Sequence, residues 1–265
     1  MRTDGAGNAP LPAGTNCTPT VALNGNGRAY WIEYNGPNLY SAPINGSDPA
    51  TIVATVAGNG TRSDFARLAV DATNAYWSTT TPAAVWWSPI TAVNGTPNVI
   101  AKSGTTSDTA TGPFGVAVDA THVYWSDRNE SKIRRRVIAS LGMNALADIV
   151  ATDVGPRDLT LDAQRIYWLT ADGFVRARSK DLKDPPVTLA SGQTAAESIL
   201  TDDRYVYWTT WTANGAVSRV PKAGGAVEVM ASNQSYPYGI TQDCGTIYWT
   251  NHANFNTGQV MKVVK

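Results

Sequence analysis

The chain has 265 residues, with 21 basic and 21 acidic side chains and a formal net charge of zero. This balance argues against nucleic acid as the main partner, and no apolar stretch is long enough to span a membrane. Met1–Gly5 is polar and does not read as a signal peptide. The polar, Gly/Asn/Thr-rich composition favours an exported protein, secreted, periplasmic or at the cell surface, whose leader is absent from this chain.

A Tyr-Trp pair recurs six times. Its tyrosines are Tyr30, Tyr76, Tyr124, Tyr167, Tyr207 and Tyr248, which are 46, 48, 43, 40 and 41 residues apart. An aspartate stands five residues before each of the last five tyrosines, and the first copy has Asn24 instead, six residues before its tyrosine. A period of about 40–50 residues is typical of propeller blades and other repeat arrays.

The fifth copy shows the predicted elements in order. Residues 198–201 are a first strand, 205–209 an aromatic and β-branched second strand, 216–220 a third and 227–231 a fourth. The intervening segments carry turn-forming Asp, Asn, Gly and Pro residues. Four strands in each of six copies predict an all-β fold, a six-bladed β-propeller with four-stranded antiparallel blades, in one domain spanning residues 1–265.

The last copy lacks a fourth strand. Its predicted strands are residues 238–242, 246–250 and 258–264, after which the chain stops. Alignment of the copies places residues 9–13 where that strand belongs, so we expect the N-terminal segment to close the last blade and pair its open edge. The two prolines in this segment suit an outer edge strand.

Two motifs carry a resemblance to known families. Tyr124-Trp125-Ser126-Asp127 resembles the Tyr-Trp-Thr-Asp (YWTD) strand of propellers in lipoprotein-receptor ectodomains, and residues 113–119 and 237–243 resemble the repeat of the NHL propellers. The resemblance covers essentially the whole chain and implies a bacterial-type relative of both. These families imply protein binding, ligand sensing or, in distant propellers, hydrolase or lyase chemistry. Thr170, Thr210 and Asn251 replace Asp127 in other copies, so the network around that aspartate is not carried over.

Function in propellers usually lies where each first strand begins and each second strand passes to the third, because loops converge there on the channel mouth. Alignment places a mixture of arginines, acids and aromatic residues at this face. We expect a monomer that binds a peptide, a protein or a glycan there without catalysis. The predicted ligand-binding residues are Arg67, Phe114, Asp127, Arg157, Asp158, Glu197, Trp211, Tyr236, Tyr238 and His252. The same loops also contain Glu33, Tyr34, Asp64, Phe65, Arg128, Glu130, Asp172, Asn251 and Asn254.

The alternative is a propeller hydrolase or lyase in which His252 works with Glu197 or Asp158. The other histidine, His122, is predicted in a turn on the opposite face. No serine-hydrolase, zinc-protease or phosphate-loop motif is present, and the lack of histidine or cysteine clusters disfavours a transition metal. No cofactor is predicted. A Ca²⁺ site is the remaining alternative, from oxygens of Asp64, Asp127, Asp158, Glu197 or Asn251.

The two cysteines, Cys17 and Cys244, fall in the first and last blades, which are neighbours in a closed ring and invite a disulfide. Counting along the first strands places them at opposite ends, ~13 Å apart at ~3.3 Å per residue. A disulfide needs Cα atoms within ~7 Å of each other. The two observations leave the pairing open.

Three further features have structural and functional interpretations. The Tyr-Trp pairs should pack into both neighbouring inter-blade layers. The repeated aspartates should cap turn amides, with a cation-binding ring as the alternative. Trp86-Trp87 is either buried under the outer strand or offers an indole to a partner. The basic run at residues 132–136 reads as a solvated strand, with a polyanion site as the alternative.

Overall fold

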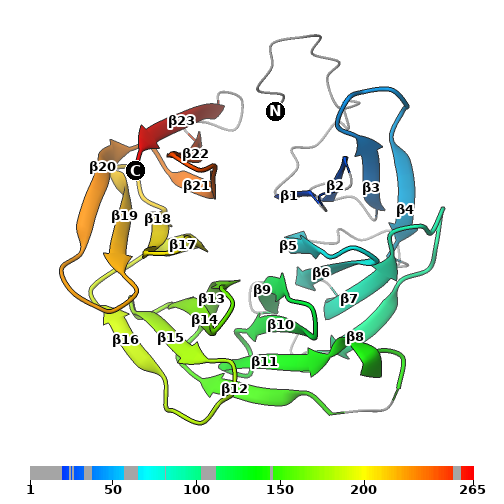
Figure 1. Cartoon of the computed structure of the whole chain (residues 1–265), viewed down its shortest axis with the longest axis horizontal. Helices are drawn as coiled ribbons and strands as arrows, with labels where there is room; N and C mark the ends of the chain where they lie inside the picture. The colour runs from blue at the N-terminus through cyan, green and yellow to red at the C-terminus, as the bar shows by residue number, and fades with distance from the viewer. Residues whose placement is uncertain are drawn as a thin grey trace. The chain divides into compact units, whose positions relative to one another are not determined.

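The computed structural model describes residues 20–23, 25, 27–32, 38–56, 65–80, 82–102, 112–143, 146–252 and 258–265. Its strands form six antiparallel sheets, and five of them contain four described strands in chain order (Figure 1). The prediction of an all-β six-bladed propeller is confirmed. In the sixth sheet the described strands are three, in the order β21-β22-β23.

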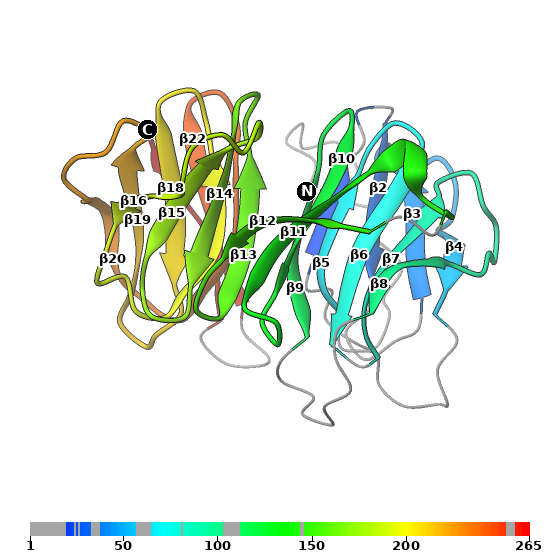
Figure 2. The same ribbon diagram turned by 90° about the horizontal axis from the view of Figure 1, so that it is seen from below.

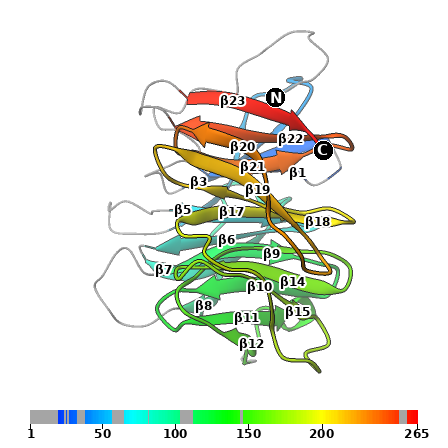
Figure 3. The same ribbon diagram turned by 90° about the vertical axis from the view of Figure 1, so that its left-hand side faces the viewer.

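The first three blades contain β1 (Thr20–Leu23), β2 (Arg28–Ile32), β3 (Asn38–Pro43), β4 (Thr51–Thr55), β5 (Phe65–Val70), β6 (Asn74–Thr80), β7 (Ala83–Pro89), β8 (Asn98–Lys102), β9 (Pro113–Val118), β10 (His122–Asp127), β11 (Lys132–Val137), the 3-10 helix η1 (Ile138–Ser140) and β12 (Asp148–Thr152). The last three contain β13 (Pro156–Leu161), β14 (Arg165–Thr170), β15 (Val175–Ser179), β16 (Val187–Ala190), β17 (Ala196–Thr201), β18 (Tyr205–Thr210), β19 (Gly215–Pro221), β20 (Glu228–Gln234), β21 (Pro237–Gln242), β22 (Thr246–His252) and β23 (Gly258–Val264). Figure 2 shows β13 to β16 running alongside one another, and Figure 3 shows β21 to β23.

The chain divides into two compact units. The first comprises Met1–Val123 and Arg136–Leu146, and the second comprises Tyr124–Arg135 and Ala147–Lys265. The division runs through β10 and β11 of the third blade, so it cuts a sheet rather than a linker. No helix in the described part of the chain has the length and apolar character needed to cross a membrane.

The Tyr-Trp pairs form the core between blades, as predicted. Neighbouring residues on a strand point to opposite faces of the sheet. Tyr167 therefore shares an apolar cluster with Trp208 of the following blade, and Tyr207 shares one with Trp249. Trp168 and Trp208 are fully buried. These tyrosine and tryptophan side chains thus join the fourth blade to the fifth and the fifth blade to the sixth.

The repeated aspartates form turns, as predicted, and four of them, Asp71, Asp162, Asp202 and Asp243, also bind their tyrosine. In the fourth blade, Asp162 Oδ1 accepts the backbone N–H groups of Gln164 and Arg165 at 2.8 and 2.7 Å, and Oδ2 accepts the Tyr167 hydroxyl at 2.7 Å. The five-residue spacing brings these two side chains together. Asp71, Asp202 and Asp243 repeat this arrangement in their own blades.

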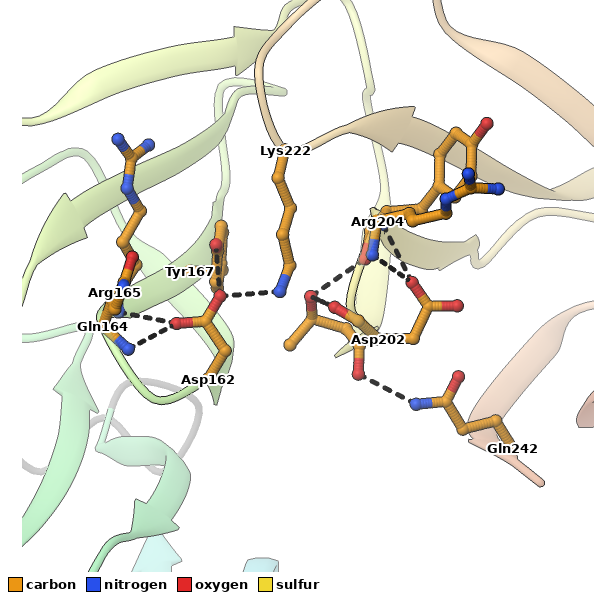
Figure 4. Close-up of polar contacts among 10 residues, drawn as sticks. Asp162, Gln164, Arg165, Tyr167, Asp202, Arg204, Lys222 and Gln242 are labelled. Atoms are coloured by element: carbon orange, nitrogen blue, oxygen red, sulfur yellow. Dashed lines mark hydrogen bonds and ion pairs between the residues drawn. The ribbon is translucent and has the colours of Figure 1, made fainter. Parts of the chain in front are cut away.

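A lysine from the next blade completes two of these turns, and Figure 4 shows the first of them, Lys222 beside Asp162. Lys222, which follows β19, places its ammonium 2.6 Å from Asp162 Oδ2. Lys265, which follows β23, lies 3.4 Å from Asp202 Oδ2. Carboxylates held by amides, a phenol and an ammonium stabilise the fold, and this use argues against the cation-ring alternative.

Trp86 and the basic run at residues 132–136 are partly buried and make contacts within the fold. Trp86 packs against the core of the first two blades, and its indole donates to Thr79 Oγ1 at 2.8 Å. In the basic run, Arg135 pairs with Asp148 at 3.1 Å, and Arg136 donates to Ile100 O at 3.0 Å. These contacts favour the structural interpretation of both features.

Some predictions fall outside the described residues. They concern Cys17, Asn24, Glu33, Tyr34, Asp64, Asn254 and residues 9–13. Cys244 is exposed, in the turn between β21 and β22. The disulfide question and the closure of the last blade therefore stay predictions.

Candidate functional site

The first strands β5, β13, β17 and β21 each begin with a β-bulge at the same place. In β13 the register shifts between Pro156 and Leu159, so Arg157 and Asp158 together face one residue of β14. The same shift occurs in the other three strands. Bulges re-aim side chains at the ends of sheets. The bulged positions hold Arg67, Arg157, Asp158, Glu197, Ser198, Tyr238 and Gly239, and this end of the sheets is called the loop face below.

A hydroxyl directly after the Tyr-Trp pair stabilises the bulge. In the fifth blade, Thr209 Oγ1 accepts the backbone N–H of Ser198 at 3.3 Å and donates to the Tyr238 carbonyl of the next blade at 2.7 Å. Ser78 makes the equivalent two bonds in the second blade. One hydroxyl therefore satisfies the bulge amide and ties neighbouring first strands together.

The fourth blade replaces this hydroxyl with Leu169, and Asp158 provides the link instead. Its carboxylate accepts the Ser198 hydroxyl at 3.0 Å and the Ile199 N–H at 3.3 Å, both from the next blade. Asp158 is only 5% exposed. This carboxylate was predicted as a ligand-binding or catalytic group, and the structure places it in the seam between the fourth and fifth blades.

Arg157 and Glu197 form an ion pair across the same seam. Arg157 Nη1 lies 2.7 Å from Glu197 Oε2, and the side chains are 28% and 10% exposed. The two residues occupy equivalent bulge positions in consecutive blades and lie 40 residues apart in sequence. Their opposite charges offset each other within the pair, which presents a guanidinium and a carboxylate side by side.

Four partly or fully exposed aromatic side chains meet next to this seam. The Trp211 ring lies 5.4 Å from Tyr236, 5.1 Å from Tyr238 and 5.4 Å from His252 between centroids. The Tyr238 and His252 rings are 5.8 Å apart. Tyr236 is 38% exposed. We call these four residues the aromatic cluster; all four were predicted for this face, and the structure brings them together.

The backbone before the first strand is left-handed in three consecutive blades. The residues at this position are Gly155, Ala195 and Tyr236, with φ of 48°, 59° and 48°. Each accepts a hydrogen bond from the residue that follows or ends the second strand of its own blade. The three bonds run from Ala171 N to Gly155 O at 3.1 Å, from Trp211 N to Ala195 O at 2.8 Å and from His252 N to Tyr236 O at 3.1 Å. The loops that carry the aromatic cluster are therefore held by backbone bonds.

Other predicted residues lie outside this group. In the first unit, the Arg67 guanidinium stacks 4.5 Å from the Phe114 ring centroid. In the second, Asp127 is 3% exposed and accepts the Glu130 N–H at 3.1 Å. His122 begins β10 beside the aspartate turn, with Nδ1 2.8 Å from Thr121 Oγ1.

The Ca²⁺ alternative finds no support in the described residues, where no three His, Cys, Asp or Glu side chains converge on a metal position. Asp158 accepts hydrogen bonds from Ser198 and Ile199, and Glu197 pairs with Arg157. Asn251, another of the proposed oxygens, accepts the Trp249 indole N–H at 3.0 Å.

No protein-family model and no curated protein matches the chain. Many solved structures do. Nidogen in a complex with laminin is 18% identical, with a TM-score of 0.63 over 81% of this chain and 79% of that chain. Virginiamycin B lyase from Staphylococcus aureus is 10% identical, with a TM-score of 0.70 over 95% and 86%.

A putative 6-phosphogluconolactonase from Bacteroides uniformis is also similar. It is 14% identical, with a TM-score of 0.65 over 92% of this chain and 82% of that chain. What the chain shares with all three is the fold. At these identities the likeness bears out the predicted six-bladed propeller and its resemblance to a YWTD-type propeller, and function has to be argued from the site.

Proposed function

We propose that the protein is a non-catalytic binding propeller whose ligand, a peptide, a protein or a glycan, contacts the aromatic cluster on the loop face of the last two blades. One observation carries this proposal. Tyr236 holds a left-handed backbone conformation at a position where the two preceding blades have glycine and alanine. A bulky residue is rarely found in this conformation, which costs it on the order of 1–2 kcal/mol.

The strain at Tyr236 is not offset by deep burial of its ring. The side chain is 38% exposed and touches Trp211. Strained residues that persist at exposed positions often serve binding, and large aromatic side chains supply much of the contact energy at recognition surfaces. The nidogen propeller, which was solved with laminin, supports protein binding only through its fold.

The enzymatic alternative is a hydrolase or lyase in which His252 works with Glu197 or Asp158. The similar lyase was also solved with quinupristin as an inactive variant whose histidine is replaced by alanine, so this fold can support histidine-dependent chemistry. Here the His252 ring packs on Trp211 and Tyr238, Glu197 pairs with Arg157, and Asp158 links two blades. None of these contacts joins His252 to either carboxylate, and this arrangement favours binding over catalysis.

The test compares binding with turnover. Wild-type protein, Trp211→Ala and Tyr205→Ala are applied to peptide and glycan arrays. Tyr205 is a matched control at the other end of the same hairpin, where its ring packs on Arg219 at 4.3 Å. We expect wild type and Tyr205→Ala to retain the same ligands, and Trp211→Ala to lose about tenfold in affinity, which corresponds to ~1.4 kcal/mol.

An esterase and lyase screen of wild type and His252→Ala runs in parallel. Turnover by wild type that disappears in His252→Ala would establish the enzymatic alternative. Array binding that is the same in Trp211→Ala and wild type would contradict the proposed site.

A further inference from the structure

We propose that the aromatic cluster and the Arg157–Glu197 pair together form a binding site for a neutral saccharide, with a sugar ring stacked on the cluster and its hydroxyls bound by the charged pair. This inference rests on the proposed binding function and names the ligand class of the same face.

The aromatic and charged parts are neighbours at one end of the same sheets. Ala196 pairs with Thr210 in the β17–β18 hairpin. Glu197 follows the first of these residues and Trp211 follows the second, so both lie at the loop-face end of one hairpin. Arg157 is joined to Glu197 by the ion pair, and Tyr238 is joined to β18 through Thr209. The site therefore spans three consecutive first strands, β13, β17 and β21.

The charge of the site suits an uncharged polar ligand. Arg157 and Glu197 offset each other, so an anion or a cation would be attracted by one partner and repelled by the other. A sugar hydroxyl both donates and accepts hydrogen bonds. Adjacent hydroxyls match a guanidinium donor and a carboxylate acceptor placed side by side, and hydrogen bonds to charged groups are about twice as strong as neutral ones.

The large rings stand on one side of the ion pair. In the fifth and sixth blades the equivalent positions at the end of the second strand hold Trp211 and His252, whereas the fourth blade has Ala171 there. The left-handed position changes in the same direction, from Gly155 to Tyr236. The number of large rings at these positions thus increases toward the sixth blade, while the fourth blade, which carries Arg157, has Gly155 and Ala171.

The backbone of the loop face argues for a sugar over an extended peptide. Peptides recognised in strand form need free backbone donors and acceptors along an edge. Here the backbone groups nearest the cluster already bond to each other, with Trp211 N on Ala195 O at 2.8 Å and Tyr236 N on Thr212 O at 2.9 Å. Recognition is left to side chains, which suits a ligand that presents hydroxyls and a ring face.

Isothermal titration calorimetry with defined oligosaccharides tests the inference. The neutral probes are the hexaoses of cellulose, xylan, mannan, laminarin and chitin, and the charged probes are hexagalacturonate and chitosan hexaose. We expect at least one neutral hexaose to bind and both charged probes to bind at least about tenfold more weakly. Arg157→Gln and Glu197→Gln should each weaken binding about five- to tenfold, as expected when a charged hydrogen-bonding partner is lost.

Tyr236→Gly separates binding from folding. Glycine suits the left-handed backbone, so this variant should melt at the same temperature as wild type or higher, yet bind the neutral hexaose about tenfold more weakly because the ring is gone. Tyr205→Ala should bind like wild type. Equal binding by Tyr236→Gly and wild type, or failure of every neutral hexaose to bind, would overturn the saccharide site.

The outcome also separates this inference from the proposed function. Trp211-dependent binding of array peptides, with no neutral hexaose bound, would leave the binding function standing and remove the saccharide. Failure of both arrays and all hexaoses would remove both.

Discussion

Four of the repeated aspartates, Asp71, Asp162, Asp202 and Asp243, use both carboxylate oxygens, and the groups around each carboxylate determine its pKa. Burial alone would raise the pKa of Asp162, but hydrogen bonds from Lys222, Tyr167 and two backbone amides outweigh it and lower the pKa to about 2. Burial, together with the hydrogen bond to the Asp202 carboxylate, raises the pKa of Tyr207 to about 12. The turns between the first and second strands are therefore stabilised by ionised aspartates.

The lysines that contact the aspartates occupy an equivalent position in their blades, the residue directly after the third strand. The residue after each third strand donates its backbone N–H to the turn of its own blade. This residue is Ile44, Ile90, Ile138, Lys180, Lys222 or Lys265 in the six copies in order. The second half of the chain therefore adds an ammonium at a position where the first half has an apolar side chain.

Replacement of Asp162 by asparagine should make stability less dependent on pH. The pKa of Asp162 is lower in the folded protein than in the unfolded chain. Its negative charge therefore stabilises the fold fully above the unfolded pKa of about 4, and this stabilisation is lost as the pH falls toward 2. At pH 7 we expect a loss of ~1 kcal/mol after allowance for solvent screening. Urea unfolding of both proteins at pH 7, 4 and 3 measures the difference, which should shrink as the pH falls.

Asp71→Asn is the matched control. Asp71 also caps its turn and accepts its tyrosine, but the lysine position is Ile138. At pH 7, Asp71→Asn should therefore lose less free energy of unfolding than Asp162→Asn. Equal losses of unfolding free energy in the two variants at every pH would show that the Lys222–Asp162 contact does not stabilise the fold.

At the scale of the element, the loop between β18 and β19 positions the aromatic cluster. A Cβ on Gly215 would lie 2.1 Å from Thr210 O and 2.5 Å from Pro237 Cδ. No side chain fits there without a shift of the backbone on either side of Trp211. The close approach of this loop to the start of β21 thus holds Trp211 against Tyr236 and Tyr238.

Replacement of Gly215 by alanine should both destabilise the protein and disturb the site. We expect a loss of roughly 2–3 kcal/mol, at the upper end for overpacking, because the overlap is with backbone. Urea unfolding checks the loss, and Trp211-dependent ligand binding should weaken with it. Gly245→Ala is the control, since nothing lies within 4 Å of its added Cβ, and it should be close to wild type.

At the scale of the whole molecule, the sixth blade differs from the others at its outer strand. Val217 of β19 and Val260 of β23 pair with equivalent threonines, Thr209 and Thr250. Val217 is fully buried, whereas Val260 is 55% exposed. β19 is covered by β20, and the described part of the chain provides no such strand beside β23. An open, apolar strand edge of this kind is normally paired or protected.

Deletion of residues 1–15 should therefore lower the melting temperature sharply, by roughly 10 °C or more, because the predicted closing strand at residues 9–13 is removed. Differential scanning calorimetry measures the change. A shorter deletion of residues 1–8 keeps the predicted strand and should melt close to wild type. An unchanged melting temperature after the longer deletion would defeat the closure model.

The architecture was predictable from the sequence because it is encoded locally. The Tyr-Trp spacing, the aspartate before each pair and the strand alternation all act within one blade, where residues a few positions apart meet in a hairpin. The ten predicted ligand-binding residues were also correctly placed, at or beside the starts of the first strands and the ends of the second strands. Their location follows from the repeat alone, because equivalent positions in each copy occupy equivalent places in each blade.

The roles of these residues required the tertiary structure. Arg157 and Glu197 meet across 40 residues because adjacent bulges turn toward each other, and Asp158 links two blades because Leu169 lacks the hydroxyl found in other copies. Tyr236 gives no sign in the sequence of its left-handed backbone, since tyrosine rarely adopts it. Contacts between blades depend on how the sheets stack and bulge, and it is these contacts that separate residues holding the fold from residues free to bind.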